Sequence, residues 1–321
     1  MISNIEKLTA DIRQVIGIKC PNGLVVSEHT DTEHFYRHTG IDELYPSVTT
    51  KKSIIDEGGS RLKRWAANLA VEYIDRNWNK ITPANKAEHY KAAVLAHEDM
   101  FEDAGLIGTA GHKVVEKYLK EWIETGVKPV DIRRFIEGED ARLWAITRSA
   151  ELFFNDFEVI PIASELKVAS IKYKFAGTLD CLFLIPKIIR EGKERTLICN
   201  HQWMGYSSKK KIDCEQCFKC DAKRKWLLVL VDLKTSNSIE KTSYAMQTAD
   251  YWQGIYEMTG LKPKEIIIVR LDKEKMKYEV MRVINRVKAF RTSRHVDKIY
   301  DYIYDGVSKM LPYNLKKEIK L

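Results

Sequence analysis

The sequence predicts an α/β fold in which a central mixed sheet is flanked by helices. Residues 181–185 and 227–231 are continuous apolar runs without Gly or Pro, which is typical of strands buried on both faces. Segments with apolar residues at helical spacing precede and follow these runs, as helices on either side of a sheet require. A chain of 321 residues, of which 45% are hydrophobic, is long enough to bury one large core.

Residues 1–106 are predicted to form an N-terminal segment and a helical cap. Helical spacing of apolar residues indicates a helix over residues 4–16, and the turn-rich stretch 18–37 indicates an irregular hairpin. Two amphipathic patterns, over residues 60–77 and 83–104, predict the helices of the cap.

Two hydroxyl side chains, Ser47 and Thr49, follow the turn that Pro46 fixes. They can cap a short helix over residues 51–55, because a hydroxyl oxygen accepts from free N–H groups in a first helical turn. They can also bind a phosphate, together with free backbone N–H groups near a helix start. The two roles are compatible, and we keep both.

Residues 107–186 and 226–321 are predicted to form the core of the domain. The elements follow from the same apolar spacings, with turns near residues 171–174 and 272–275. The expected helices are 108–122, 132–155, 239–259 and 287–310, and the expected strands are 157–170, 175–185, 227–234, 265–271 and 277–283.

Charged residues end the most apolar strand. Asp232 and Lys234 point to the same face of that strand, with Leu233 on the other. They are costly to bury unless they pair or hold a metal. Asp180 is the single charge in residues 176–185. Two carboxylates at a common rim suit Mg²⁺ or Mn²⁺, and a nearby Lys suits the hydrolysis of a phosphodiester.

These residues resemble those of the PD-(D/E)XK nucleases. The signature is Gly177-x-x-Asp180 followed by Asp232-x-Lys234. Further matches to the RecB-like branch come in that branch's order: the first motif at residues 108–116, with His112 and Glu116 on one helix face, and the Gln-x-x-x-Tyr motif at Gln247 and Tyr251. The segment 46–50, with Trp65 after it, is similar to the entry segment of phage exonucleases and of the mitochondrial genome maintenance exonuclease.

The resemblance implies a restriction-endonuclease-like core and a metal-dependent DNA exonuclease in replication, recombination or repair. Asp180, Asp232, His112 and the backbone carbonyl of Leu233 would hold Mg²⁺ or Mn²⁺, with Lys234 catalytic and Glu116 in support. Ser47, Thr49, Gln247 and Tyr251 would contact DNA.

Glu165 has two interpretations of equal weight. It precedes Asp180 by fifteen residues, about the separation needed for neighbouring antiparallel strands joined by a turn, so its carboxylate can join the catalytic group. Alternatively, Glu165 is a solvent-facing strand residue paired with Lys167 or Lys172.

Residues 187–225 are predicted to be a basic, metal-binding insert between two catalytic strands. The insert has eleven Lys and Arg against five Asp and Glu, which accounts for +6 of the net charge of +8. Thiolates clustered in a stretch too short for its own core favour a structural Zn²⁺ site. We expect zinc and keep an iron–sulfur cluster as the alternative. The ligands expected are Cys199, Cys214 and Cys217, completed by Cys220 or His201.

The charge and the N-terminus suggest partners and a compartment. A net charge of +8 and a pI near 9.0 favour a polyanion, here DNA that is single-stranded or has free ends. No run of eighteen apolar residues is present, so we expect no membrane span. The N-terminus lacks an apolar secretory core, which predicts a cytoplasmic protein, in the host cytoplasm if phage-encoded. A replication or recombination protein is the further partner considered.

Two other functions fit the same residues. An endonuclease could use the same core. A non-catalytic DNA-binding or assembly protein could use the insert instead.

Overall fold

The computed structural model describes residues 4–29, 34–40, 43–55, 59–190, 193–196 and 223–303. Its main sheet has the strand order β4-β5-β7-β8-β9, and β6 pairs with β5 beside this path. The pair β7–β8 is parallel and the other pairs are antiparallel, so the predicted mixed sheet is confirmed. The strands are β4 (Ile160–Ser170), β5 (Phe175–Arg190), β6 (Lys193–Thr196), β7 (Lys223–Lys234), β8 (Glu265–Leu271) and β9 (Tyr278–Arg282).

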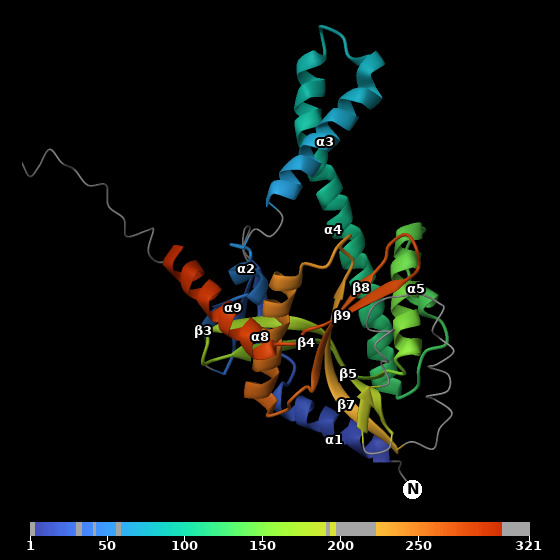
Figure 1. Cartoon of the computed structure of the whole chain (residues 1–321), viewed down its shortest axis with the longest axis vertical. Coiled ribbons are helices and arrows are strands. Elements are labelled where there is room, and N and C mark those ends of the chain that lie inside the picture. The colour runs from blue at the N-terminus through green and yellow to red at the C-terminus, as the bar shows by residue number, and fades with distance from the viewer. Residues whose placement is uncertain are drawn as a thin grey trace, which may run out of the picture.

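Helices cover both faces of this sheet (Figure 1). One core lies between the sheet and α4 (Lys86–Thr125) with α5 (Ala141–Asp156). The other lies between the sheet and α1 (Asn4–Lys19) with α8 (Lys241–Thr259). The parallel strands β7 and β8 are joined through α8, because a parallel pair requires a crossover connection.

The strand β7 is buried on both faces, as its apolar run predicts. Val229 and Val231 belong to the core under α4 and α5, whereas Leu228 and Leu230 belong to the core under α1 and α8. Side chains alternate along a strand, so a run without polar interruption can fill two cores at once.

The N-terminal hairpin is more regular than predicted. β1 (Val25–His29), β2 (His34–His38) and β3 (Glu43–Pro46) form a three-stranded antiparallel sheet. It joins the main fold at a bridge between Ser47 and Ala176 of β5, and Tyr36 Oη lies 2.9 Å from Thr178 Oγ1. The short helix α2 (Val48–Lys52) follows.

The helices predicted at residues 83–104 and 108–122 are one helix of 40 residues, α4. Gly105 and Gly108 do not end it, because glycine inside a helix costs only about 1 kcal/mol relative to alanine. With α3 (Gly59–Asn77) and the 3₁₀ turn η1 (Trp78–Lys80), the first half of α4 forms a hairpin that stands away from the sheet (Figure 1).

Other boundaries also differ from prediction. The helix expected at 132–155 is a 3₁₀ turn, η2 (Ile132–Phe135), followed by α5, which begins where Asp140 accepts a hydrogen bond from Arg142 N–H. The last described helix is α9 (Arg286–Asp301), and the end of the helix predicted over 287–310 lies outside the described residues. Among the helices that the structure describes, none has the length and apolar character needed to cross a membrane.

Candidate functional site

Three carboxylates occupy facing positions on three neighbouring strands. The pairs Ser164↔Cys181 and Leu166↔Leu179 place Glu165 opposite Asp180. The pair Cys181↔Val231 brings Asp180 near Asp232, one residue beyond the end of this ladder. Besides burial, the charge of Asp180 raises the pKa of both Glu165 and Asp232, so the three carboxylates lie close together, and we call them the acidic row of β4, β5 and β7.

Asp180 is fixed where the pairing of its strand with β7 ends. The last pair in this ladder is Cys181↔Val231. Beyond it, the Leu233 backbone N–H donates to Asp180 Oδ2 at 2.6 Å. The carboxylate thus takes the place of a strand carbonyl, which orients it and lets it accept a charge-assisted hydrogen bond.

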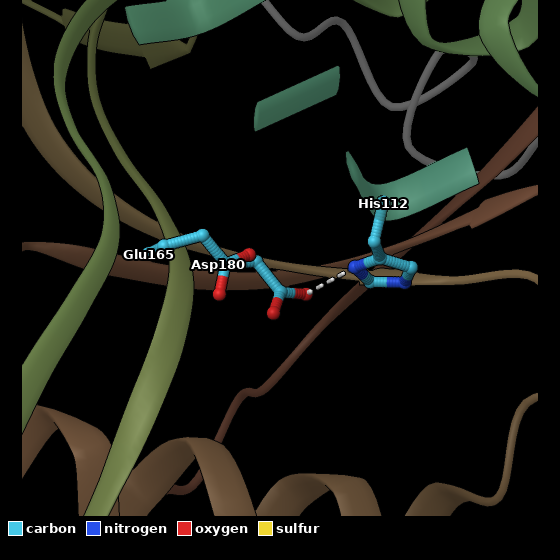
Figure 2. Close-up of side chains that lie close together, drawn as sticks. All are labelled: His112, Glu165 and Asp180. Carbon is cyan, nitrogen blue, oxygen red and sulfur yellow. Dashed lines mark ion pairs between the residues drawn. The ribbon is translucent and has the colours of Figure 1, made fainter. Parts of the chain in front are cut away.

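His112 approaches the acidic row from α4. Its Nδ1 lies 3.9 Å from Asp180 Oδ2, and one ligand atom each from His112, Glu165 and Asp180 lie within 4.8 Å of one another. Figure 2 shows the two carboxylates and the imidazole pointing toward one another. The structure therefore brings together three of the predicted site residues, from a helix and two strands.

Glu165 adopts a backbone conformation that is uncommon for a residue with a side chain. Its φ is 50°, in the left-handed region, which costs about 1–2 kcal/mol outside glycine. The structure places its carboxylate with Asp180 and His112, not with Lys167 or Lys172. Burial, followed by the charges of Asp180 and Glu116, raises the pKa of Glu165 to about 8.

Asp232 is buried and pairs with Lys234. The Lys234 ammonium lies 2.8 Å from Asp232 Oδ2 and 3.0 Å from Oδ1, and the side chain of Asp232 is only 2% exposed. Burial raises the pKa of Asp232 to about 7, although Lys234 opposes the rise. Burial alone would lower the pKa of Lys234, but Asp232 and Asp180 more than offset it, so this pKa is raised.

A chain of polar contacts holds the ammonium of Lys234. Gln247 Oε1 lies 3.4 Å from Lys234 Nζ, and Gln247 Nε2 donates to Tyr251 Oη at 2.9 Å. Both Gln247 and Tyr251 are buried. The structure thus shows them positioning Lys234, while their predicted contact with DNA stays a prediction.

Tyr244 is a site residue that the sequence interpretation missed. The Lys234 ammonium lies 4.7 Å from the centre of the Tyr244 ring, a cation–π contact that helps to hold the amine in place. Tyr244 precedes Gln247 by three residues and Tyr251 by seven, so all three share one helix face. That spacing in the sequence was the signal that could have revealed it.

Two glycines let the motif elements meet. A Cβ built at Gly108 of α4 would lie 2.7 Å from Thr235 Oγ1, next to Lys234, and one built at Gly177 of β5 would lie 2.5 Å from the Tyr251 ring. A side chain at Gly177 would displace the buried Tyr251 ring, and one at Gly108 would require the Thr235 hydroxyl to move. Gly108 begins the segment that resembles the first RecB-like motif, and its lack of a side chain makes room for Thr235.

Glu116 lies one helical turn beyond His112 and pairs with Lys120. It is outside the group of three ligand atoms but close enough to raise the pKa of Glu165. A cavity of about 630 Å³ opens beside Glu116 and Glu165. Its walls include Lys120, Lys167, Tyr36 and Thr178, so the site can be reached from between α4 and the three-stranded sheet.

Ser47 is a helix cap, which confirms one of its two predicted roles. Its Oγ accepts a hydrogen bond from Thr50 N–H at 2.9 Å. Ser47 is buried, so its hydroxyl is engaged inside the protein. Thr49 is exposed, and its Oγ1 lies 2.9 Å from Ser47 Oγ. Its contact with a phosphate stays a prediction.

The predicted zinc ligands lie outside the described residues. These are Cys199, His201, Cys214, Cys217 and Cys220. The described cysteines, Cys20 and Cys181, are both buried free thiols.

Comparison of the chain with models of protein families and with curated proteins found no match.

Proposed function

We propose that this protein is a metal-dependent DNA nuclease with a restriction-endonuclease-like core, of the RecB-like PD-(D/E)XK type, and that it acts as an exonuclease. The observation that carries the proposal is the acidic row of Glu165, Asp180 and Asp232, with His112 on one side and the Asp232–Lys234 pair on the other. An acidic row with one fixed amine at its rim is typical of phosphoryl transfer that depends on Mg²⁺ or Mn²⁺.

The donors fit a divalent ion on three grounds. Carboxylate oxygens with one imidazole suit Mn²⁺ and Mg²⁺. Neighbouring carboxylates repel one another when ionised, and the pKa values of Glu165 and Asp232 are raised first by burial and then by the charge of Asp180, both of which a bound cation would offset. Asp232 Oδ2 is buried and contacts the Lys234 ammonium at 2.8 Å, which leaves a lone pair of this oxygen for a metal ion. His112, Asp180, Asp232 and the Leu233 carbonyl would hold the ion, with Glu165 beside it.

In the proposed reaction, the metal ion and the side chains of the protein have separate roles. A bound Mg²⁺ or Mn²⁺ acidifies an attacking water and offsets charge on the phosphoryl oxygens. Lys234 keeps its proton at neutral pH, because its pKa is raised, and can donate hydrogen bonds to the water and to a phosphoryl oxygen. Gln247 and Tyr244 hold the amine in place, so it needs little reorganisation during the reaction.

Zinc in residues 187–225 is part of the same proposal. Cys199, Cys214 and Cys217, with Cys220 or His201, would form a tetrahedral site. The ladder of β5 and β7 extends to Ile189↔Lys223, so the proposed metal would tie together the loop between two paired strands. Elemental analysis of the purified protein distinguishes zinc from iron.

The experiment that tests the function uses two single-stranded DNA substrates, one linear with a labelled end and one circular. Each is incubated with Mg²⁺, Mn²⁺ or EDTA. We expect the linear DNA to be degraded with either metal and left intact in EDTA. Circular DNA should resist, because an enzyme that needs an end cannot open it. Cleavage of the circle would support the endonuclease instead. Inactivity with both metals would contradict the nuclease and favour a protein that only binds DNA.

Metal binding should also change the pH dependence of stability. Glu165 and Asp232 have a higher pKa in the folded protein than their ordinary values of 4.5 and 3.8. The folded state therefore binds the protons more tightly, and the free energy of unfolding of the metal-free protein falls as pH rises from about 4.5 to about 8. Mn²⁺ should raise the melting temperature more at pH 8 than at pH 5.

Thermal melts of the protein in EDTA and in Mn²⁺ check this prediction. Glu165→Gln should flatten the fall in stability between pH 5 and pH 8. The matched variant Glu124→Gln, at an exposed glutamate of the same helix as His112, should behave like the unaltered protein. Equal effects of Mn²⁺ at both pH values would contradict the assignment of these carboxylates.

A further inference from the structure

The hairpin of residues 59–106, here called the arm, cannot bury its own apolar side chains. Its two helices touch through Trp65 and Phe101, whose ring centres lie 4.8 Å apart, and through Tyr73 Oη and His89 Nδ1 at 3.3 Å. Of the arm residues whose side chains are described, only Ala93 is buried. Two helices make one contact surface and no enclosed core, so their outer faces are left to solvent.

The flank of α4 that borders its contact with α3 carries a regular apolar stripe, and Phe101 belongs both to this stripe and to the contact with Trp65. Val94 is 65% exposed, Phe101 50% and Tyr90 48%. With Ala87 and His97 these positions have spacings of three and four residues, the pattern of a helix that packs along its length on another helix. The stripe begins at Ala87 and ends at Phe101, about 21 Å along the helix.

The charges beside the stripe differ between its two ends. Lys91 flanks the N-terminal half and Glu98 the C-terminal half, and because they are seven residues apart they lie on the same side of the stripe. Lys91 and Glu98 are exposed and form no ion pair with another described residue. A helix that covers this stripe should therefore be acidic where the stripe is basic, and basic where it is acidic.

We propose that the stripe binds the same stripe of a second copy of this chain, with the two α4 helices antiparallel. A two-fold axis near Val94 and Leu95 would place Lys91 of each copy beside Glu98 of the other. A two-fold contact requires a surface complementary to itself, and this arrangement of charge has that property. Two two-helix arms together make a four-helix bundle, which encloses the core that one arm lacks.

The charges also favour this partner over DNA. Glu98, Asp99 and Glu102 lie within one and a half turns on the C-terminal half of the arm helix, and they would repel phosphates. A parallel pair of copies is also disfavoured, because it would place Lys91 beside Lys91 and Glu98 beside Glu98.

The dimer should be weak, and it should bring two candidate sites into one assembly. A stripe of about two heptads is short for an isolated helix pair, so we expect a dissociation constant on the order of micromolar. His112 lies on the same continuous helix, eleven residues after Phe101, about 16 Å along its axis. Two paired arms would therefore hold two sites in one assembly, whatever reaction the sites perform.

Sedimentation equilibrium of the full chain tests the proposal. The unaltered protein should associate to a dimer as its concentration rises toward about 100 µM, and Val94→Glu should remain monomeric at the same concentrations. The matched control is Val130→Glu, at a valine that is 97% exposed in a loop outside the arm, and it should dimerise normally. Circular dichroism should show equal helix content in all three proteins.

Charge reversal identifies the partner as the second copy. Lys91→Glu alone and Glu98→Lys alone should each weaken the dimer about tenfold, since each dimer contains two such pairs. The double variant restores opposite charges and should regain most of the affinity. A monomer at about 100 µM, or a dimer that survives Val94→Glu, would overturn the proposal. The proposal would also be overturned if Val94→Glu abolished DNA binding while the variant and the unaltered protein had the same state of association.

Discussion

Asp232→Asn is expected to reduce the rate of DNA cleavage by a factor of about 10³ or more. The substitution keeps the size of the side chain but removes a full negative charge from the acidic row. Asp232 is the buried member of that row and the partner of the Lys234 ammonium. An amide would hold a divalent ion weakly and would leave Lys234 without its counter-ion, so both parts of the proposed chemistry fail together.

The same substitution should leave the metal-free fold nearly as stable as before. Burial raises the pKa of Asp232 to about 7, which means that its charged form is disfavoured in the folded protein. Removing the charge relieves repulsion from Asp180 while it breaks the pair with Lys234, and these effects oppose each other. Thermal melts in EDTA should therefore show a small shift compared with the loss of activity.

A matched control separates chemistry from structure. Asp272→Asn changes another buried aspartate, at the end of β8, where the carboxylate accepts from Glu274 and Lys275 N–H groups. An amide oxygen can accept the same hydrogen bonds, so cleavage should be unchanged. Lys234→Ala should abolish cleavage as Asp232→Asn does. Full activity in either site variant would remove the nuclease assignment.

The sequence predicted the sheet because its strands leave strong signals. In the unbroken apolar runs at 181–185 and 227–231, the side chains on both faces of the strand must be removed from water. The cores on both sides of β7 confirm this. Helix ends were harder to predict. Two helices were predicted over residues 83–104 and 108–122, yet packing of α4 on the sheet and on α3 outweighs a helix penalty of about 1 kcal/mol for each of Gly105 and Gly108.

The site was predictable in composition but not in its internal contacts. Alternation along strands indicated that Asp180, Asp232 and Lys234 would share a rim. It could not indicate that Glu165 takes a left-handed φ of 50°, because alternation along a strand assumes an extended backbone at every residue. Nor could it indicate that Gln247 turns inward to Lys234 and lies buried on its helix.

A buried ionic cluster joins α2 to the helix of the Gln-x-x-x-Tyr motif. Lys52 Nζ lies 3.1 Å from Asp250 Oδ2 and 2.5 Å from Asp297 Oδ1. Arg294 contacts both acids, at 2.6 and 2.5 Å, and Ser293 Oγ donates to Asp250 at 2.6 Å. Burial raises the pKa of Asp250 despite the two nearby cations. The carboxylate therefore depends on Lys52 and Arg294 to remain charged.

Lys52→Met should lower the free energy of unfolding by about 3 kcal/mol, because it keeps most of the apolar stem but leaves two buried acids with one cation. For a chain of this size we expect the melting temperature to fall by about 6 °C. Lys51→Met is the matched control, since Lys51 is equally buried but pairs at 3.4 Å with Asp301, whose side chain is 54% exposed. It should lower the melting temperature by about 2 °C or less. Equal losses in the two variants would show that burial of the lysine stems, and not the ionic cluster, holds α2 against α8 and α9.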